Sequence, residues 1–157
     1  MKKQFFENET DGFYGTYYEN SKGVDCAVIG LFGDDPNDYM AKCGAKWLHK
    51  NGVNVLCTSP GRKNYSHVNY PLERIETAIK WLQNHGNRKI GIMGISTTGM
   101  DALVAASYFP DITLTVSFTG SDFVWQGFEQ GKKDGCKEWP VPNASTLSWK
   151  GEPLAYM

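Results

Sequence analysis

Ser96 is the residue whose type and surroundings best suit covalent chemistry in this chain. It follows an apolar run that includes Ile90, Ile92 and Met93, and this run predicts a short strand buried on both faces. Apolar residues at helical spacing come next and end near residues 109–110, which predicts a helix. A strand, a tight turn and a helix around a serine are typical of a nucleophile elbow. Such a turn lifts the hydroxyl above the sheet, and the helix N-terminus supplies N–H donors for an oxyanion.

The residues around Ser96 match an elbow well, with one departure. An elbow needs small residues two places before and two places after the serine so that the turn can close. Gly94 satisfies the first requirement, but Thr98 occupies the second place and Gly99 comes one residue late. The simpler alternative is that Ser96 only caps the helix, which serines often do.

Two phosphate-binding motifs are excluded for the same stretch. Residues 94–99 have the glycine spacing that opens a phosphate-binding loop, but Met100 and Asp101 stand where Lys and Ser or Thr are required. A G-x-G-x-x-G dinucleotide fingerprint is also missing from the chain. Nucleotide binding at this turn is therefore not expected.

The composition indicates one ordinary globular domain over residues 1–157, with 41% apolar and 13% aromatic residues. A net charge of −1 argues against nucleic-acid and membrane-surface partners, which favour basic patches. The first residues contain no apolar signal core, and no apolar run approaches membrane-spanning length. These features predict a cytoplasmic location.

The four cysteines show no pairing pattern typical of a metal or disulfide framework. They are Cys26, Cys43, Cys57 and Cys136, and none forms a C-x-x-C pair. Two of them fall in expected buried strands, so we expect reduced thiols. The sequence implies no metal and no bound cofactor.

Strands and helices are expected to alternate through most of the chain. Besides the run before Ser96, residues 26–32, 53–57 and 112–118 read as strands, with amphipathic helices between them. This order predicts an α/β fold with a mostly parallel sheet, right-handed crossovers and helices on both faces. Ligands of such sheets bind beyond the carboxyl ends of the strands, where Ser96 and the loop after residue 32 lie. Residues 120–157 are rich in Gly, Pro and aromatic residues and are expected to form an irregular tail.

Four short runs carry a family likeness: GFYGTYY at 12–18, IMGIS at 92–96, VWQG at 124–127 and WKGEPL at 149–154. Together they resemble the C-terminal catalytic domain of acyl-CoA thioesterases and bile acid-CoA:amino acid N-acyltransferases, within the α/β-hydrolase superfamily. The resemblance implies a three-layer α/β-hydrolase-like sandwich. It also implies that the last strands and helices of a complete domain are missing from this sequence.

The resemblance assigns chemical roles to several residues. It implies that Ser96 attacks an ester or thioester carbonyl to form an acyl-enzyme, and a serine here favours hydrolysis over transfer to an amine. The oxyanion hole would combine the Thr97 N–H with an N–H near Gly33 or Asp34. Backbone donors of this kind are worth about 3 kcal/mol each in the transition state. Asp34 and Asp35 depart from the family pattern and would disfavour an anionic substrate such as a CoA thioester.

The general base is the missing part of the expected machinery. In this fold the acid and then the histidine follow the serine, yet no histidine comes after Ser96. His49 and His85 are expected at the opposite end of the sheet, as solvated or capping residues. His67 follows a strand on the side of the expected site and is the candidate base. Asp122 follows the last expected strand and is a candidate for the rim of the site.

The sequence leaves three functions open. The first is a serine acyl hydrolase of thioesterase or carboxylesterase type, acting on a small acyl ester or thioester. The second is a non-catalytic relic or binding protein that keeps the fold without the base. The third is an assembly partner that uses the aromatic tail. The expected strand Ile112–Phe118 would form an apolar edge, so a homodimer covering that edge is also expected.

Overall fold

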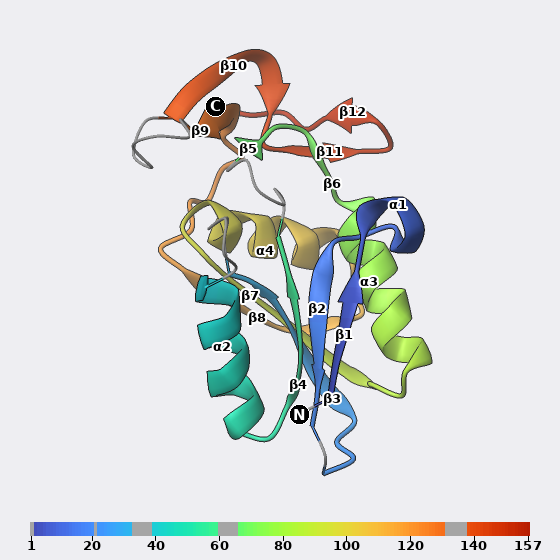
Figure 1. Cartoon of the computed structure of the whole chain (residues 1–157). Helices are drawn as coiled ribbons and strands as arrows, with labels where there is room; N and C mark the ends of the chain where they lie inside the picture. Colours follow the sequence, from blue (N-terminus) through green and yellow to red (C-terminus); the bar gives the residue numbers. More distant parts are fainter. Residues whose placement is uncertain (1, 21, 33–38, 60–65, 131–137) are drawn as a thin grey trace.

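The computed structural model describes residues 2–20, 22–32, 39–59, 66–130 and 138–157 (Figure 1). Four helices and twelve strands lie in this part of the chain. In chain order they are β1 (Lys2–Phe6), α1 (Asn8–Asp11), β2 (Gly15–Glu19), β3 (Cys26–Leu31), α2 (Tyr39–Lys50), β4 (Asn54–Thr58), β5 (Ser66–His67), β6 (Tyr70–Pro71), α3 (Glu73–Asn84), β7 (Lys89–Ile95), α4 (Thr97–Tyr108), β8 (Ile112–Phe118), β9 (Gln126–Gln130), β10 (Glu138–Ser145), β11 (Leu147–Trp149) and β12 (Glu152–Pro153).

A six-stranded sheet in the order β1-β2-β4-β3-β7-β8 forms the centre of the fold. The strands β4, β3, β7 and β8 run parallel to their neighbours, while β2 is antiparallel to both β1 and β4. The expected α/β fold with a mostly parallel sheet is therefore confirmed. Since β3 and β7 are parallel neighbours, Leu31 at the end of β3 and the turn after β7 lie at the same edge of the sheet.

Helices cover both faces of this sheet (Figure 1). On one face, α3 and α4 pack against buried strand residues such as Ile29, Leu56 and Ile92. On the other face, Ala45 and Leu48 of α2 pack against a second buried cluster that includes residues of β4 and β7. The strands are thus buried from both sides, which explains why their sequences read as short, nearly continuous apolar runs.

The sequence spacing in α3 shows how a helix is fixed to the sheet. Ile75, Ala78, Ile79 and Leu82 recur at three- and four-residue intervals and are all buried. This spacing places one apolar stripe on one side of a 3.6-residue helix. Burial of that stripe sets the position of α3, and the chain leaves the helix directly into β7, the strand that carries the elbow.

Residues 120–157 do not form the irregular tail expected from the sequence, because this segment contains β9, β10, β11 and β12. Two three-stranded sheets arise here, in the orders β10-β9-β5 and β12-β11-β6. Their partners β5 and β6 lie about 60 to 80 residues earlier in the chain, and Tyr70 N–H donates to the Thr146 carbonyl at 2.8 Å. Figure 1 shows these short strands gathered at the end of the molecule beyond α4. The Gly and Pro residues of this segment gave no local strand pattern, and β9 and β11 also need partners from distant parts of the chain.

The strand β8 occupies one edge of the six-stranded sheet, as the sequence predicted. Leu114 and Phe118 on this strand are exposed. Pairing of this edge with a second copy stays a prediction. Within the described residues no helix combines the length and apolarity needed to cross a membrane.

We expect Leu82→Ala to destabilise the fold by about 2–5 kcal/mol, because the side chain is fully buried on the sheet-facing side of α3 (0% exposed). The same change at Leu103 of α4, whose side chain is 43% exposed, should cost much less. Urea unfolding followed by circular dichroism measures both free energies of unfolding. Equal losses in the two variants would contradict the assigned core.

Candidate active site

The backbone of Ser96 adopts the conformation required of an elbow nucleophile. Its φ of 55° and ψ of −125° lie in a region that non-glycine residues rarely occupy. The residue stands between β7 and α4, its side chain is exposed, and it makes no capping hydrogen bond to the helix. The Ser96 hydroxyl therefore does not cap α4, and its role as the nucleophile stays a prediction. A residue held in such strain at the start of a helix is typical of a functional position.

Two neighbours close the turn, one from each side of Ser96. A Cβ atom at Gly94 would lie 2.0 Å from the Thr98 carbonyl oxygen, so only glycine fits there. Thr98 takes the second place in spite of its larger side chain, because that side chain points into the interior and is buried. The elbow thus closes without the usual second glycine.

Gly99 does not replace the second small residue of the elbow. It allows α4 to approach β8 instead. A Cβ atom at Gly99 would lie 2.9 Å from Ser117 Oγ and 3.1 Å from the Phe118 carbonyl oxygen. The missing side chain therefore lets the first turn of α4 approach the end of β8. At this contact the Ser96 N–H donates to the Phe118 carbonyl at 2.8 Å, which anchors the turn to the neighbouring strand.

Part of the expected oxyanion hole lies in the described structure. Thr97 is the first residue of α4, where N–H groups have no acceptor within the helix. Its N–H therefore remains suited to an anionic oxygen, with the helix dipole adding favourable charge. Gly33 and Asp34, the expected sources of the second donor, lie outside the described residues.

His49 and His85 lie far from Ser96, as expected. His49 is in the last turn of α2, and its Nε2 is 3.0 Å from the Glu19 carbonyl oxygen. His85 follows α3 and stacks on Trp81 with ring centroids 3.7 Å apart. From there the chain must run along the seven residues of β7, about 23 Å, to reach the elbow. Neither histidine can serve as the base.

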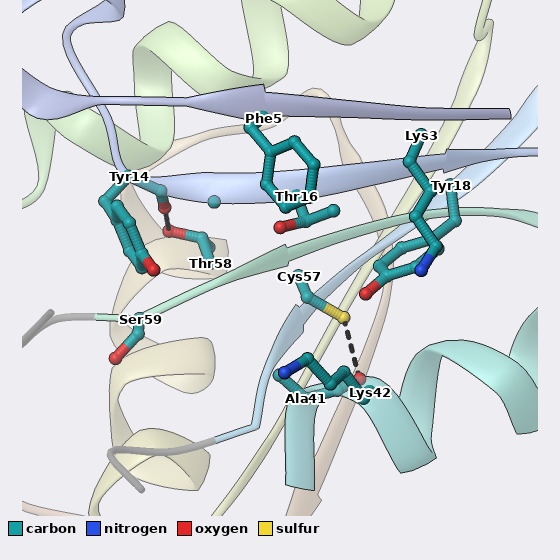
Figure 2. Close-up of a pocket in the computed structure, with 11 residues that line it drawn as sticks. Lys3, Phe5, Tyr14, Thr16, Tyr18, Ala41, Lys42, Cys57, Thr58 and Ser59 are labelled. Carbon is teal, nitrogen blue, oxygen red and sulfur yellow. Dashed lines mark hydrogen bonds between the residues drawn. The ribbon is translucent and has the colours of Figure 1, made fainter. Parts of the chain in front are cut away.

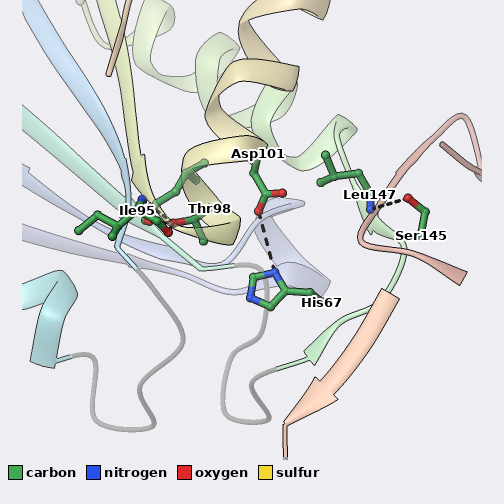
Figure 3. Close-up of polar contacts among 7 residues, drawn as sticks. His67, Ile95, Thr98, Asp101, Ser145 and Leu147 are labelled. Atoms are coloured by element: carbon green, nitrogen blue, oxygen red, sulfur yellow. Dashed lines mark hydrogen bonds and ion pairs between the residues drawn. The ribbon is translucent and has the colours of Figure 1, made fainter. Parts of the chain in front are cut away.

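His67 faces an aspartate that the sequence did not single out as its partner (Figure 3). His67 Nδ1 lies 4.0 Å from Oδ2 of Asp101, and the ring stacks on Phe128 of β9. The side chains of His67 and Asp101 are only 2% and 1% exposed. Asp101 belongs to α4, five residues after Ser96, so the pair joins the elbow helix to the segment that carries β5. The only signal in the sequence was a lone acidic residue in an otherwise apolar helix.

A buried tyrosine extends this polar cluster. Burial raises the pKa of the Tyr70 phenol to about 12, and the nearby Asp101 carboxylate adds to the rise. The hydrogen bond with Thr58 and the charge of Arg74 act in the opposite direction. Tyr70 therefore stays neutral, and it is buried close to Asp101, as His67 is.

Asp122 does not join this polar cluster among the described contacts. Its side chain is exposed and lines an apolar groove beside α4, about 370 Å³ in volume, together with Leu103 and Phe123. Asp122 thus lies beyond the end of β8 as predicted, and its role at the rim of a site stays a prediction.

A second pocket lies on the α2 face of the sheet, where β4 ends (Figure 2). Lys3 of β1 and Lys42 of α2 line it together with hydroxyl groups, among them Thr58 and Ser59 at the end of β4. Since β3 alone separates β4 from β7 in the sheet, this pocket opens near the elbow side of the molecule. The two lysines give this pocket positive charge, whereas Asp34 and Asp35 lie outside the described residues.

A strained serine between a strand and a helix of an α/β sheet is consistent with the family whose model matches this chain. Residues 70–150, just over half of the chain, match the family described as BAAT / Acyl-CoA thioester hydrolase C terminal. The chain belongs to this family. The membership confirms the likeness inferred from the short motifs, of which those at 92–96 and 124–127 lie inside the match. His67 lies before the matched residues, whereas Ser96 and Asp101 lie within them.

A solved structure of similar fold supports the architecture of this BAAT/acyl-CoA thioester hydrolase family member. It is a protein assigned as a dienelactone hydrolase from Klebsiella pneumoniae subsp. pneumoniae MGH 78578. The two structures superimpose with a TM-score of 0.55 at 14% identity, over 94% of this chain and 70% of the other. At that identity the likeness shows the α/β-hydrolase fold alone. Comparison with curated protein sequences finds no match.

We expect Tyr70→Phe to make the folded state less sensitive to alkali. The unfolded phenol ionises near pH 10 and the folded one near pH 12, so the free energy of unfolding falls by about 1.4 kcal/mol per pH unit between these values. Removing the hydroxyl abolishes the contribution of Tyr70 to the fall in the free energy of unfolding with pH. Denaturant unfolding at pH 9 to 12 measures it, with Tyr156→Phe as the control at an exposed ring. Identical slopes in the wild type and Tyr70→Phe would contradict the assigned burial of the phenol.

Proposed function

We propose that this protein is a serine acyl hydrolase of thioesterase or carboxylesterase type, with Ser96 as the nucleophile. The observation that carries the proposal is the strained, exposed Ser96 between β7 and α4. Ser96 Oγ would attack the ester or thioester carbonyl, releasing the alcohol or thiol and leaving an acyl-enzyme that water then hydrolyses. The Thr97 N–H would receive part of the charge on the carbonyl oxygen.

His67 is the proposed general base, and Asp101 is its proposed partner. A carboxylate beside one ring nitrogen of a histidine fixes the tautomer and leaves the other nitrogen to accept a proton. Asp101 takes this position at Nδ1, and Nε2 is the ring nitrogen that we propose accepts the serine proton. The 4.0 Å separation is longer than a good hydrogen bond, and such contacts often tighten when substrate binds. In chain order this base precedes the serine, unlike the usual order of the fold.

A non-catalytic relic is the second candidate, and one observation favours it. The His67 ring is almost fully buried between Asp101 and Phe128, which is also what a purely structural histidine would show. Without a working base the elbow and the oxyanion donors would still give slow turnover, about a thousandfold faster than water. Weak esterase activity alone therefore does not separate the two candidates.

The serine proposal predicts covalent labelling by a fluorophosphonate at Ser96. We expect rapid formation of one adduct, detected by intact mass, and no adduct in Ser96→Ala. Circular dichroism shows whether both proteins are folded. If the folded wild type stays unlabelled, the elbow survives as architecture alone and the relic is the better account.

The base proposal predicts a loss of reactivity when the histidine is removed. We expect His67→Ala to lower the labelling rate constant by about 10²–10⁴-fold, the usual contribution of a general base. Asp101→Asn should lower it in the same direction, because it removes the charge that orients the ring. His85→Ala is the matched control, since that histidine lies at the far end of β7. Labelling of His67→Ala at the wild-type rate would rule out His67 as the base.

A further inference from the structure

Thr98 makes a set of hydrogen bonds that a glycine in its place could not make (Figure 3). Its hydroxyl oxygen accepts the Ile95 N–H at 3.0 Å. The same oxygen lies 2.5 Å from the Leu31 carbonyl oxygen and 2.9 Å from the Ile95 carbonyl oxygen. The residue is buried, so these contacts are shielded from water.

The Thr98 hydroxyl extends the hydrogen-bond ladder between β3 and β7 by one step. Backbone pairing of the two strands ends at Leu31 and Gly94. A hydroxyl group has one proton to donate, and the shorter contact assigns it to the Leu31 carbonyl. The Ile95 N–H then bonds to Thr98 Oγ1, which in turn donates to Leu31. The last link between the two strands therefore runs through a side chain.

This link joins the end of β3 to the residue before Ser96, the two places from which the expected oxyanion hole would draw its donors. On one side, Ile95 directly precedes Ser96. On the other side, Leu31 is the last residue of β3, and the chain continues from it toward Gly33 and Asp34. The Thr98 hydroxyl thus ties the end of β3 to the residue before the nucleophile.

We propose that Thr98 is a positioning residue, whose hydroxyl sets the distance between the nucleophile and the end of β3. The inference rests on the proposed function, since it concerns the geometry of the same acyl-transfer site. Thr98 touches no reacting atom and acts through the backbone of Ile95 and Leu31. A shift of about 1 Å in such a site can lower the rate about a hundredfold without removing any catalytic group.

The test compares Thr98→Val, which keeps the shape but loses the hydroxyl, with Thr98→Ser, which keeps the hydroxyl. Thr113→Val is the matched control, because the Thr113 hydroxyl also bonds to a β7 carbonyl, that of Ile90 at 3.2 Å, at the opposite end of the strand. The readouts are kcat and KM with p-nitrophenyl butyrate, the fluorophosphonate labelling rate, and hydrogen exchange at the Ile95 amide.

We expect Thr98→Val to lower kcat and the labelling rate constant about 10- to 100-fold with KM unchanged, and to speed exchange at the Ile95 amide. Thr98→Ser and Thr113→Val should stay within about threefold of the wild type. A purely structural role would lower the stability of Thr98→Val and leave kcat of the folded fraction intact.

The outcomes separate the two proposals. An active wild type with an equally active Thr98→Val overturns the positioning role and leaves Ser96 as the nucleophile. Equal losses of kcat in Thr98→Val and Thr98→Ser also overturn it, because the hydroxyl would then not be the cause. A folded wild type that is neither labelled nor active overturns the proposed function, and the positioning role falls with it.

Discussion

The close approach of backbone to backbone around Ser96 is the constraint on which the rest of the site depends. A left-handed φ at a serine costs about 1–3 kcal/mol, and it persists only where the surroundings hold it. Here Gly94 leaves room for the Thr98 carbonyl, and the Ser96 N–H is fixed to the end of β8. The serine is therefore held from both sides by the ends of strands that the buried core keeps in place.

The two three-stranded sheets cover the end of the molecule beyond α4 (Figure 1). β9 and β11 pair with β5 and β6, and in doing so they enclose His67, Tyr70 and Asp101. Leu147 of β11 belongs to the same core cluster as the residues of α3 and α4. The C-terminal segment is thus part of the packing around the candidate site. Burial of an ionisable group is costly unless a polar group lies beside it, and Asp101 lies 4.0 Å from His67.

The family match supports the proposed role of Ser96, whereas the geometry supports the proposed role of His67. The BAAT/acyl-CoA thioester hydrolase match covers the turn at Ser96, α4 and most of the C-terminal strands, so the proposed nucleophile lies within it. The candidate base comes from β5, outside that match. Lys3 and Lys42 line the α2-face pocket and give it positive charge.

The amino-acid sequence by itself determined the alternation of strands and helices, the place of Ser96 between them, and the family. These features follow from local apolar spacing and from short motifs, which act over only a few residues. Tertiary structure decided the pairing of β9 with β5 and of β11 with β6, the meeting of His67 with Asp101, and the hydrogen bond of Thr98 to Leu31. Each of these joins residues from separate elements, mostly far apart in the chain. No local pattern encodes them, because only the packed sheet brings those side chains together.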